Sequence, residues 1–236
     1  MSTTAAVILG AGNGIRMGQA INKVYLEIEG LPIIVRAARP FAQHHDINRL
    51  VIVAAEHELD RCRRVFRSAG IKVSAVIAGG ETRHASEACA LEYLAPNIEC
   101  GEVEFVLIHD GARPFFDGAT LNELLEKAHY SGGAICALPL EDDLAHLNGR
   151  FARPMVDRAG FWRAQTPQVF RAQVLLDAYR SAAVSGFEGT DTAASVERVG
   201  GTVEVVRGDA RNIKITQPED LVLAESLIGA TGRGKR

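Results

Sequence analysis

The sequence has few cysteines, which argues against a fold built on disulfides or structural zinc. Its 236 residues contain four of them, and none stands in C-x-x-C spacing. Zinc sites and disulfide frameworks depend on clustered or regularly spaced cysteines, so neither is predicted here. We expect all four to be reduced packing residues: Cys62, Cys89, Cys100 and Cys136.

Long hydrophobic runs are also absent. No apolar stretch reaches the about 18 to 20 residues that a membrane-spanning helix needs, and residues 1–4 carry no charged start of a signal peptide. We therefore predict a cytoplasmic protein without a membrane partner.

A strong excess of charge of either sign is missing as well. The formal net charge is −3, which provides no general attraction for nucleic acid or an anionic membrane. We therefore expect no nucleic-acid partner, and a phosphate ligand would have to be held by local cations. The basic residues 233–236 are interpreted as a frayed terminus.

Hydrophobic residues make up 47% of the chain, enough for one sizeable core, and we predict a single domain over residues 1–236. Short apolar runs recur, each followed by residues with helical periodicity. Because the runs are continuously apolar and not alternating, both faces of each strand should be buried in a mostly parallel sheet. The predicted fold class is therefore α/β, a Rossmann-like three-layer α/β/α sandwich.

The expected strands are residues 5–9, 50–54, 72–77, 104–108 and 134–138. The expected helices are residues 33–43, 56–68, 82–94, 118–130, 172–185, 190–199 and 218–228. Pro40 should kink or end the first of these helices.

Residues 141–154 break this alternation. The pair Asn148-Gly149 is a strong tight-hairpin signal, so we predict a projecting β-hairpin arm over about residues 139–158. An isolated hairpin is marginally stable in water. The arm is therefore expected to pack on another subunit of a homodimer.

The glycine-rich segment Gly10–Gly18 directly follows the first apolar run. A strand that ends in glycines lets backbone N–H groups turn toward an anion, and a nearby helix start adds partial positive charge. The dinucleotide fingerprint G-x-G-x-x-G does not fit, because Ile15 and Met17 stand where a third glycine is needed. The P-loop motif does not fit either, since the one Gly-Lys pair is Gly234-Lys235.

What remains is a glycine loop with two nearby cations, Arg16 and Lys23. Charges of this kind would suit a triphosphate. The alternative is a glycine-rich turn with two solvated basic residues, and the strand context favours the phosphate interpretation.

Asp110 follows the apolar residues 104–108, at the same predicted sheet edge as the glycine loop. An acid at the end of a buried strand can hold a divalent metal or a ribose hydroxyl. The alternative is an aspartate that caps the following turn. We interpret His109 as a neighbour of the site and not as a catalyst.

Two later segments carry further candidates. Arg158 and Thr166 could bind a phosphate through a guanidinium fork and a hydroxyl, and Trp162 between them is interpreted as a core or interface aromatic. Residues 211–216 are predicted to form a late strand before a helix that begins at Pro218. On that strand Lys214 would point away from the apolar face, either to solvent or into the site.

Taken in order, these motifs resemble the 2-C-methyl-D-erythritol 4-phosphate cytidylyltransferase family over nearly the whole chain. The related ribitol-5-phosphate cytidylyltransferases share most of them, and residues 161–168 are more similar to the erythritol branch. The segments that carry the resemblance are Gly10–Gly18, Lys23, residues 79–83 with Ser86, residues 109–114, residues 157–168, Thr190-Asp191 and residues 212–220.

The resemblance implies a nucleotidyltransferase fold and a CTP-dependent reaction. A phosphate oxygen of a sugar-alcohol phosphate would attack the α-phosphorus of CTP, releasing pyrophosphate and forming CDP-methylerythritol for isoprenoid synthesis. It also implies Mg²⁺ as cofactor, with Asp110 on the metal or ribose side, and a hairpin arm that dimerises. Arg16 and Lys23 would stabilise the pentavalent transition state.

The remaining roles also come from the resemblance. Arg158 and Lys214 would aim the incoming phosphate as further catalytic residues, helped by Thr166 and by Arg113 from the neighbouring subunit. The nucleotide would contact Gly10, Ala11, Gly12, Asn13, Gly14, Gly80, Glu81, Ser86 and Asp110.

The chain departs from the family pattern in three places. The arm pattern P-V-x-D-T-x-K leads one to expect a threonine and a lysine where Asp143 and Ala145 stand, and Asn22 replaces the usual proline before the lysine. A carboxylate beside a phosphate dianion is repulsive unless it is protonated or bridged by a metal. Either the acceptor binds differently, or it is another polyol phosphate such as ribitol 5-phosphate.

Two other classes stay open from the residues. A non-catalytic nucleotide-binding homologue is disfavoured by the intact cations, and a nicotinamide oxidoreductase is disfavoured by the missing third glycine.

Overall fold

A computed structural model of the chain describes residues 3–12, 22–144, 146–148, 151–153 and 159–233. Asn13, Gly14, Arg16, Ala145 and Arg158 lie outside the described residues. Within the described part, no helix has the length and the hydropathy needed to cross a membrane.

The described strands include a seven-stranded central sheet in the order β11-β7-β10-β6-β1-β4-β5. Its members are β1 (Thr4–Leu9), β4 (Ile47–Ala54), β5 (Ala75–Ala78), β6 (Phe105–Asp110), β7 (Gly133–Pro139), β10 (Trp162–Arg171) and β11 (Glu204–Arg207). Every pairing is parallel except the two that β10 makes with β6 and β7. The prediction of a mostly parallel sheet is confirmed.

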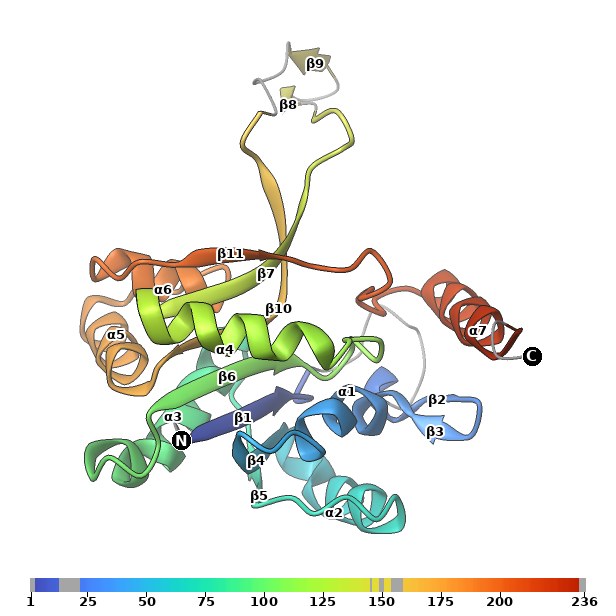
Figure 1. Ribbon diagram of the computed structural model, residues 1–236, viewed down its shortest axis with the longest axis horizontal. Helices are drawn as coiled ribbons and strands as arrows, with labels where there is room; N and C mark the ends of the chain where they lie inside the picture. The colour runs from blue at the N-terminus through green and yellow to red at the C-terminus, as the bar shows by residue number, and fades with distance from the viewer. Residues whose placement is uncertain (1–2, 13–21, 145, 149–150, 154–158, 234–236) are drawn as a thin grey trace.

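Helices cover both faces of this sheet (Figure 1). Successive strand side chains point to opposite faces, so Ala6 and Ile8 of β1 pack with α1 (Ile33–Ala42), α2 (Leu59–Ser68) and α4 (Ala119–Ser131). Ala5 and Val7 pack with α3 (Arg83–Glu99), α5 (Ala172–Ser185) and α6 (Thr192–Arg198). The two apolar clusters on either side of the strands confirm the three-layer sandwich.

Shorter elements complete the described fold. These are η2 (Lys23–Tyr25), the hairpin of β2 (Glu27–Ile28) and β3 (Leu31–Pro32), η3 (Glu56–Glu58), and α7 (Pro218–Arg233). The helix α7 lies beside the β2–β3 hairpin (Figure 1), where Ala224 packs with Ile28, Ile33 and Ile215.

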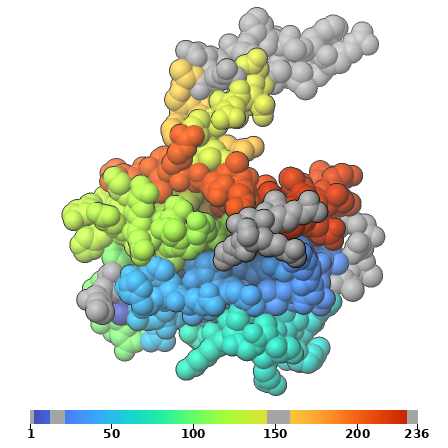
Figure 2. Space-filling model, turned by 45° about the vertical axis from the view of Figure 1, so that its right-hand side comes forward, coloured from blue at the N-terminus to red at the C-terminus, as the bar shows by residue number. Residues whose placement is uncertain are grey.

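The hairpin arm predicted from Asn148-Gly149 is confirmed as a local structure. The strands β8 (His146–Asn148) and β9 (Phe151–Arg153) pair in antiparallel fashion. The ends of β7 and β10 form the stem, continued by the Leu140 N–H donating to the Phe161 carbonyl at 3.0 Å. The stem stands clear of the body in Figures 1 and 2.

Trp162 lies on this stem and is 45% exposed, so it is not a core residue of this chain. The core interpretation is therefore wrong, and the interface interpretation stays a prediction.

Several details differ from the sequence predictions. Cys89 and Cys100 are exposed, so only Cys62 and Cys136 are the packing residues that we expected. The strands β10 and β11 were not predicted. In β10, the polar residues Arg163, Gln165 and Gln168 interrupt the apolar pattern, and the register with β7 shifts between Ala164 and Gln168. Residues 211–216 form no strand, since their backbone bonds go to a loop and not to a ladder, as in the Ile215 N–H to Ala112 carbonyl bond of 2.9 Å. Pro40 lies inside α1, which ends two residues later at Ala42.

The register of the parallel strands explains where the site lies. Leu9 pairs with Val53 on one side and with Asp110 on the other, and Ala54 pairs with Ala78. The segments that follow β1, β5 and β6 therefore leave the sheet at one edge, and their polar residues meet there.

Candidate functional site

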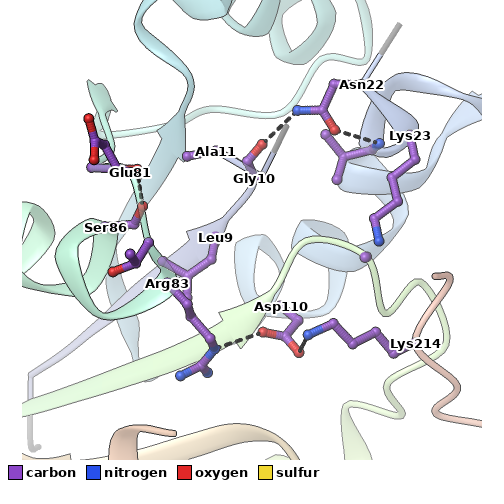
Figure 3. Close-up of a pocket in the computed structure, with 15 residues that line it drawn as sticks. Leu9, Gly10, Ala11, Asn22, Lys23, Glu81, Arg83, Ser86, Asp110 and Lys214 are labelled. Carbon is purple, nitrogen blue, oxygen red and sulfur yellow. Dashed lines mark hydrogen bonds and ion pairs between the residues drawn. The ribbon is translucent and has the colours of Figure 1, made fainter. Parts of the chain in front are cut away.

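A cavity of about 200 Å³ lies at the carboxyl edge of the parallel strands (Figure 3). The loops after β1, β5 and β6 form its walls, together with the turn η2, the start of α3 and the segment before α7. Nine residues predicted as site residues line it: Gly10, Ala11, Gly12, Lys23, Gly80, Glu81, Ser86, Asp110 and Lys214. Segments far apart in the sequence are thus brought to one pocket.

Glycine is required where two of these loops approach each other. A Cβ on Gly79 would lie 2.6 Å from the Ala11 Cβ and 2.7 Å from the Ser86 Oγ. Such distances are too short for any larger side chain, so the glycine lets the loop after β5 pack against the loop after β1.

The helix α3 begins at the wall of this pocket. Thr82 caps it, with its hydroxyl accepting from the Ala85 N–H at 3.1 Å, and the Ser86 hydroxyl donates to the Gly80 carbonyl at 3.3 Å. A helix start carries partial positive charge, so α3 adds to the attraction of this pocket for an anion.

Asp110 is the electrostatic centre of the pocket and is only 6% exposed. Among the described residues, three cations surround its carboxylate: the Lys214 Nζ at 2.9 Å, and the Nε atoms of Arg83 and Arg113 at 3.4 Å each. Burial opposes ionisation, but the attraction of Lys214, Arg83 and Arg113 outweighs it and holds the pKa of Asp110 well below its usual range. The carboxylate therefore stays ionised at neutral pH.

Lys214 was predicted to point either to solvent or into the site, and its contact with Asp110 decides for the site. It comes from the extended segment before α7 and not from a strand.

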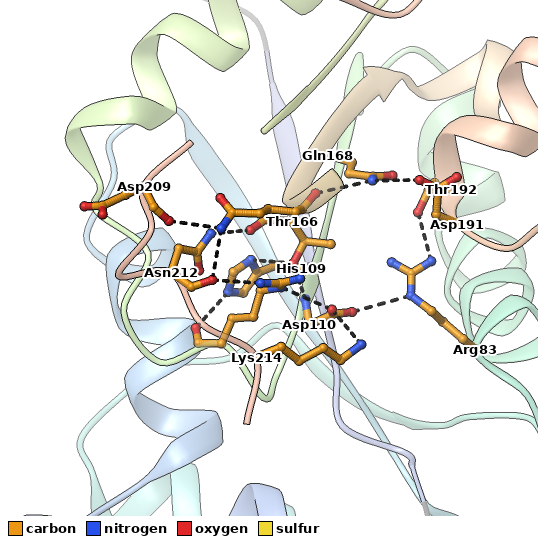
Figure 4. Close-up of polar contacts among 12 residues, drawn as sticks. Arg83, His109, Asp110, Thr166, Gln168, Asp191, Thr192, Asp209, Asn212 and Lys214 are labelled. Carbon is orange, nitrogen blue, oxygen red and sulfur yellow. Dashed lines mark hydrogen bonds and ion pairs between the residues drawn. The ribbon is translucent and has the colours of Figure 1, made fainter. Parts of the chain in front are cut away.

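Thr166 holds the backbone of Asp110 through a hydrogen bond (Figure 4). Its hydroxyl oxygen accepts from the Asp110 N–H at 3.0 Å and lies 3.2 Å from the His109 Nδ1. Because the amide can only donate, the hydroxyl proton is directed to the imidazole. The hydroxyl that the sequence assigned to a phosphate is buried and engaged within the chain, so here it positions Asp110.

His109 is completely buried between these groups. Burial lowers the pKa of His109 to about 4, so the ring is neutral at pH 7. With Nδ1 accepting from Thr166, Nε2 carries the proton and donates to the Arg113 carbonyl at 3.1 Å. The interpretation of His109 as a neighbour and not a catalyst agrees with this geometry.

Arg113, which the resemblance assigned to a neighbouring subunit's site, contacts its own chain here. Its Nη1 donates to the Asn212 carbonyl at 2.7 Å in addition to the Asp110 contact. Arg113, Arg163 and Lys214 together line a second cavity of about 240 Å³ next to the first.

Arg83 stands in a recognised motif, but the sequence analysis gave it no role. Figure 4 shows its contacts with Asp110 and with the hydroxyl of Thr192. It also forms an ion pair with Glu87. Glu87 is 1% exposed and also accepts from Thr192 and Tyr179. Burial raises the pKa of Glu87 and of Tyr179. The i, i+4 spacing of Arg83 and Glu87 on a predicted helix was the signal that could have indicated this pair.

The described pocket therefore combines a glycine loop, a helix start, two lysines and an ionised carboxylate. This set can hold a polyphosphate and leave one acid for a hydroxyl or a cation.

A family model described as 2-C-methyl-D-erythritol 4-phosphate cytidylyltransferase matches residues 4–230. The chain belongs to this family. A family protein from Geobacillus kaustophilus is 41% identical over 226 residues, covering 95% of this chain and 96% of the relative. One from Geotalea uraniireducens is 40% identical over 225 residues, covering 94% and 95%.

Solved structures agree. The crystal structure of 2-C-methyl-D-erythritol 4-phosphate cytidylyltransferase from Thermus thermophilus is 30% identical with a TM-score of 0.72, covering 94% of this chain and 97% of that one. A 4-diphosphocytidyl-2C-methyl-D-erythritol synthase structure is 29% identical with a TM-score of 0.81, covering 97% and 99%. The family resemblance and the fold class predicted from the sequence are confirmed.

Proposed function

We propose that this protein transfers CMP from CTP to 2-C-methyl-D-erythritol 4-phosphate, and that the pocket around Asp110 binds the CTP. Membership of the family supports the reaction. The observation that carries the assignment of the pocket is the ionised Asp110, 2.9 Å from Lys214, in a cavity that Lys23 and the glycine loop also line.

In the reaction, an oxygen of the acceptor phosphate forms a bond to the α-phosphorus of CTP. The bond from that phosphorus to the oxygen shared with the β-phosphate breaks, and pyrophosphate leaves with the electron pair. Such chemistry depends on positioning and on neutralising negative charge. We assign Lys23 to the phosphates, with Arg16 as its expected partner, and Gly80, Glu81 and Ser86 to the cytidine.

Mg²⁺ fits this site. Glu81 and Asp110 are the carboxylates among the described residues that line the pocket, and Mg²⁺ in such sites binds through one or two carboxylates together with substrate phosphates. Asp110 would hold the ion, because its carboxylate is ionised and lies in the wall of the pocket. When bound, Mg²⁺ supplies neutralisation of the phosphate charge.

One group of three potential metal ligands was found among the described residues, His44, His45 and Asp46. None of these residues lines the pocket.

The Mg²⁺ proposal can be tested by chelation. Removal of divalent ions with EDTA should abolish turnover, and added Mg²⁺ should restore it. Full turnover in EDTA would contradict the Asp110 assignment.

We assign the acceptor phosphate to the second cavity. Arg113, Arg163 and Lys214 bring three positive charges to it, and Lys214 lines both cavities, so an acceptor held there would face the nucleotide. We expect Arg163→Ala to raise the KM for the acceptor more than the KM for CTP. Equal effects on both would contradict this placement.

A second candidate acceptor is ribitol 5-phosphate, favoured by the exposed Asp143 on the arm where the family pattern has a threonine. Pyrophosphate release with CTP and Mg²⁺ should be compared for the two acceptors at equal concentration. A preference for methylerythritol phosphate supports the proposed function, whereas a preference for ribitol phosphate supports the second candidate. No release with either would refute both.

The arm supports a further part of the proposal, a homodimer. Leu144, Phe161 and Trp162 are apolar, lie in or next to the stem, and are each nearly half exposed. Burying such side chains on a second copy would stabilise the arm, which has little core of its own.

A further inference from the structure

The side chain of Asn22 joins three segments at the edge of the site, and Figure 3 shows its contact with Gly10. Its Nδ2 donates to the Gly10 carbonyl at 3.0 Å and to the Glu58 Oε2 at 2.9 Å, and its Oδ1 accepts from the Val24 N–H at 3.3 Å. The partners fix the orientation of the amide, because a backbone N–H only donates while a carbonyl and a carboxylate only accept. Asn22, Val24 and Glu58 are all buried.

Each of these segments has a defined place. Gly10 follows β1, and its own N–H donates to the Val53 carbonyl at 2.7 Å, so both polar backbone groups of this glycine are held. Val24 belongs to η2, the single turn that carries Lys23. Glu58 ends η3 and directly precedes α2.

Lys23 depends on this arrangement for its position. In Figure 3 its side chain extends from η2 toward the side of the pocket where Asp110 and Lys214 lie. A lysine side chain is flexible, so the place of its backbone decides which phosphate oxygens it can reach. The Asn22 side chain links η2 to the loop that follows β1. This link sets the distance between Lys23 and the glycine loop, the two parts of the proposed phosphate site.

We infer that Asn22 is a positioning residue for the transfer reaction, acting as a clamp between the Gly10 loop and the turn of Lys23, with Glu58 as its anchor. This inference rests on the proposed function, because it requires that Lys23 acts on the phosphates. The family pattern described above leads one to expect proline at this position, where this chain has asparagine. Proline has no side-chain amide and could not donate these two hydrogen bonds.

The charge of Glu58 strengthens the clamp. A hydrogen bond to an ionised acceptor is shorter and stronger than one between neutral groups, and here the carboxylate is shielded from water. The Asn22 amide donates to the anchor and to the glycine loop at the same time, so loss of the anchor should loosen the contact with Gly10.

The test is Asn22→Asp, which keeps the size of the side chain and the acceptor for the Val24 N–H. It places an acceptor against the Gly10 carbonyl and a negative charge against Glu58. We expect kcat at saturating CTP and acceptor to fall about 10- to 100-fold, with a smaller change in the KM for CTP and an unchanged circular dichroism spectrum. A folded variant with the wild-type kcat would overturn the inference.

A matched control is Asn97→Asp, since the Asn97 Nδ2 donates to the Glu102 Oε2 at 2.8 Å on the exposed surface. The same chemical change is made there opposite the same kind of partner, and kcat should not change. A loss of kcat equal to that of Asn22→Asp would overturn the inference, because the effect would not be specific to the site.

The double variant Asn22→Asp with Glu58→Gln puts an amide donor opposite the new carboxylate. It should recover several-fold of the lost kcat, which a general loss of stability would not predict; no recovery would contradict the role of Glu58. If Asn22→Asp does not fold, Glu58→Ala replaces it, because it removes the anchor while the Asn22 side chain itself stays unchanged. A several-fold lower kcat in that variant supports the clamp, and an unchanged kcat overturns it.

Lys23→Ala in the same series separates this inference from the proposed function. Full activity of Lys23→Ala would contradict the role assigned to Lys23. A strong loss in Lys23→Ala, together with normal kcat in the Asn22 and Glu58 variants, would contradict the clamp alone.

Discussion

At the scale of single residues, the site depends on how burial and neighbouring charges set protonation. Asp110 stays ionised because three cations surround it, while His109, one residue earlier, stays neutral because it is buried. Two adjacent side chains at the end of β6 thus differ in charge. The ionised Asp110 lines the pocket, and the neutral His109 lies buried behind it.

The burial of His109 predicts a pH dependence of stability. Its pKa is about 4 in the folded chain against an ordinary value of 6.5, so between these values the unfolded chain binds the extra proton. Stability is then fully present above about pH 6.5 and is lost as the pH falls toward 4, by about 3 kcal/mol for this group. Urea unfolding between pH 7 and pH 4 measures this, and a His109→Gln variant should show a flatter dependence. An equally steep fall in both would contradict the assignment to His109.

Lys23 carries a prediction on activity. Lys23→Ala should lower kcat by about 100- to 1,000-fold, because a charge directed at the transferring phosphate acts mainly in the transition state. Lys127→Ala is the control: Lys127 pairs with Glu204 on the exposed outer face of α4 and β11, and its loss should leave kcat unchanged. Near-normal turnover of Lys23→Ala would contradict the role of this lysine.

At the scale of elements, the helix α3 carries an ion pair of which the acid, Glu87, is buried and the base, Arg83, is partly exposed. The start of α3 forms a wall of the pocket, and its first residue, Arg83, contacts Asp110 and Glu87. Glu87, one turn later, accepts from Tyr179 of α5 and from Thr192 of α6. Such an ion pair matters most when its buried partner is removed: among the described residues Arg83 then keeps only its ion pair with Asp110, and the hydroxyls of Tyr179 and Thr192 lose their acceptor.

Glu87→Ala should therefore lower the free energy of unfolding by about 3 kcal/mol, whereas Glu87→Gln should cost less because it keeps acceptors for Thr192 and Tyr179. Glu92 on the same helix is the matched control. Its ion pair with Arg180 is exposed, so Glu92→Ala should change stability by less than about 1 kcal/mol. Chemical denaturation of the three variants compares them, and equal losses for Glu87→Ala and Glu92→Ala would contradict the importance of burial.

At the scale of the whole molecule, the arm is the part that the body of the fold does not explain. Its stem continues β7 and β10 past the edge of the sheet (Figure 1). Leu144, Phe161 and Trp162 are exposed there. Exposed apolar side chains gathered on a projection favour a contact with another protein surface.

If a second copy of the chain covers the stem, Phe161→Ser with Trp162→Ser should shift the protein from dimer to monomer in light scattering. Tyr130→Ser with Val184→Ser removes two exposed apolar side chains from the body and should leave the oligomeric state unchanged. A wild-type protein that is already monomeric at micromolar concentration would contradict the dimer.

The sequence alone determined the family, the fold class and the meeting of the main motifs. Apolar runs that are not alternating require burial on both faces, hence a parallel sheet, and parallel strands bring Gly10, Gly80 and Asp110 to one edge whatever the details of packing. The CTP-dependent transferase activity inferred from these motifs is supported by the family match. The cytoplasmic location, the dependence on Mg²⁺ and the dimer stay predictions.

Only the tertiary structure decided the contacts around those motifs. Four contacts of the site join residues from different parts of the chain, up to 109 positions apart. They are the bonds of Lys214 to Asp110, of Thr166 to His109, of Arg83 to Thr192 and of Asn22 to Glu58. Local periodicity carries information about which face a residue occupies, but not about which distant group it meets. Those partners follow from the packing of the three layers, because only the folded chain brings the polar groups of separate elements within hydrogen-bonding distance.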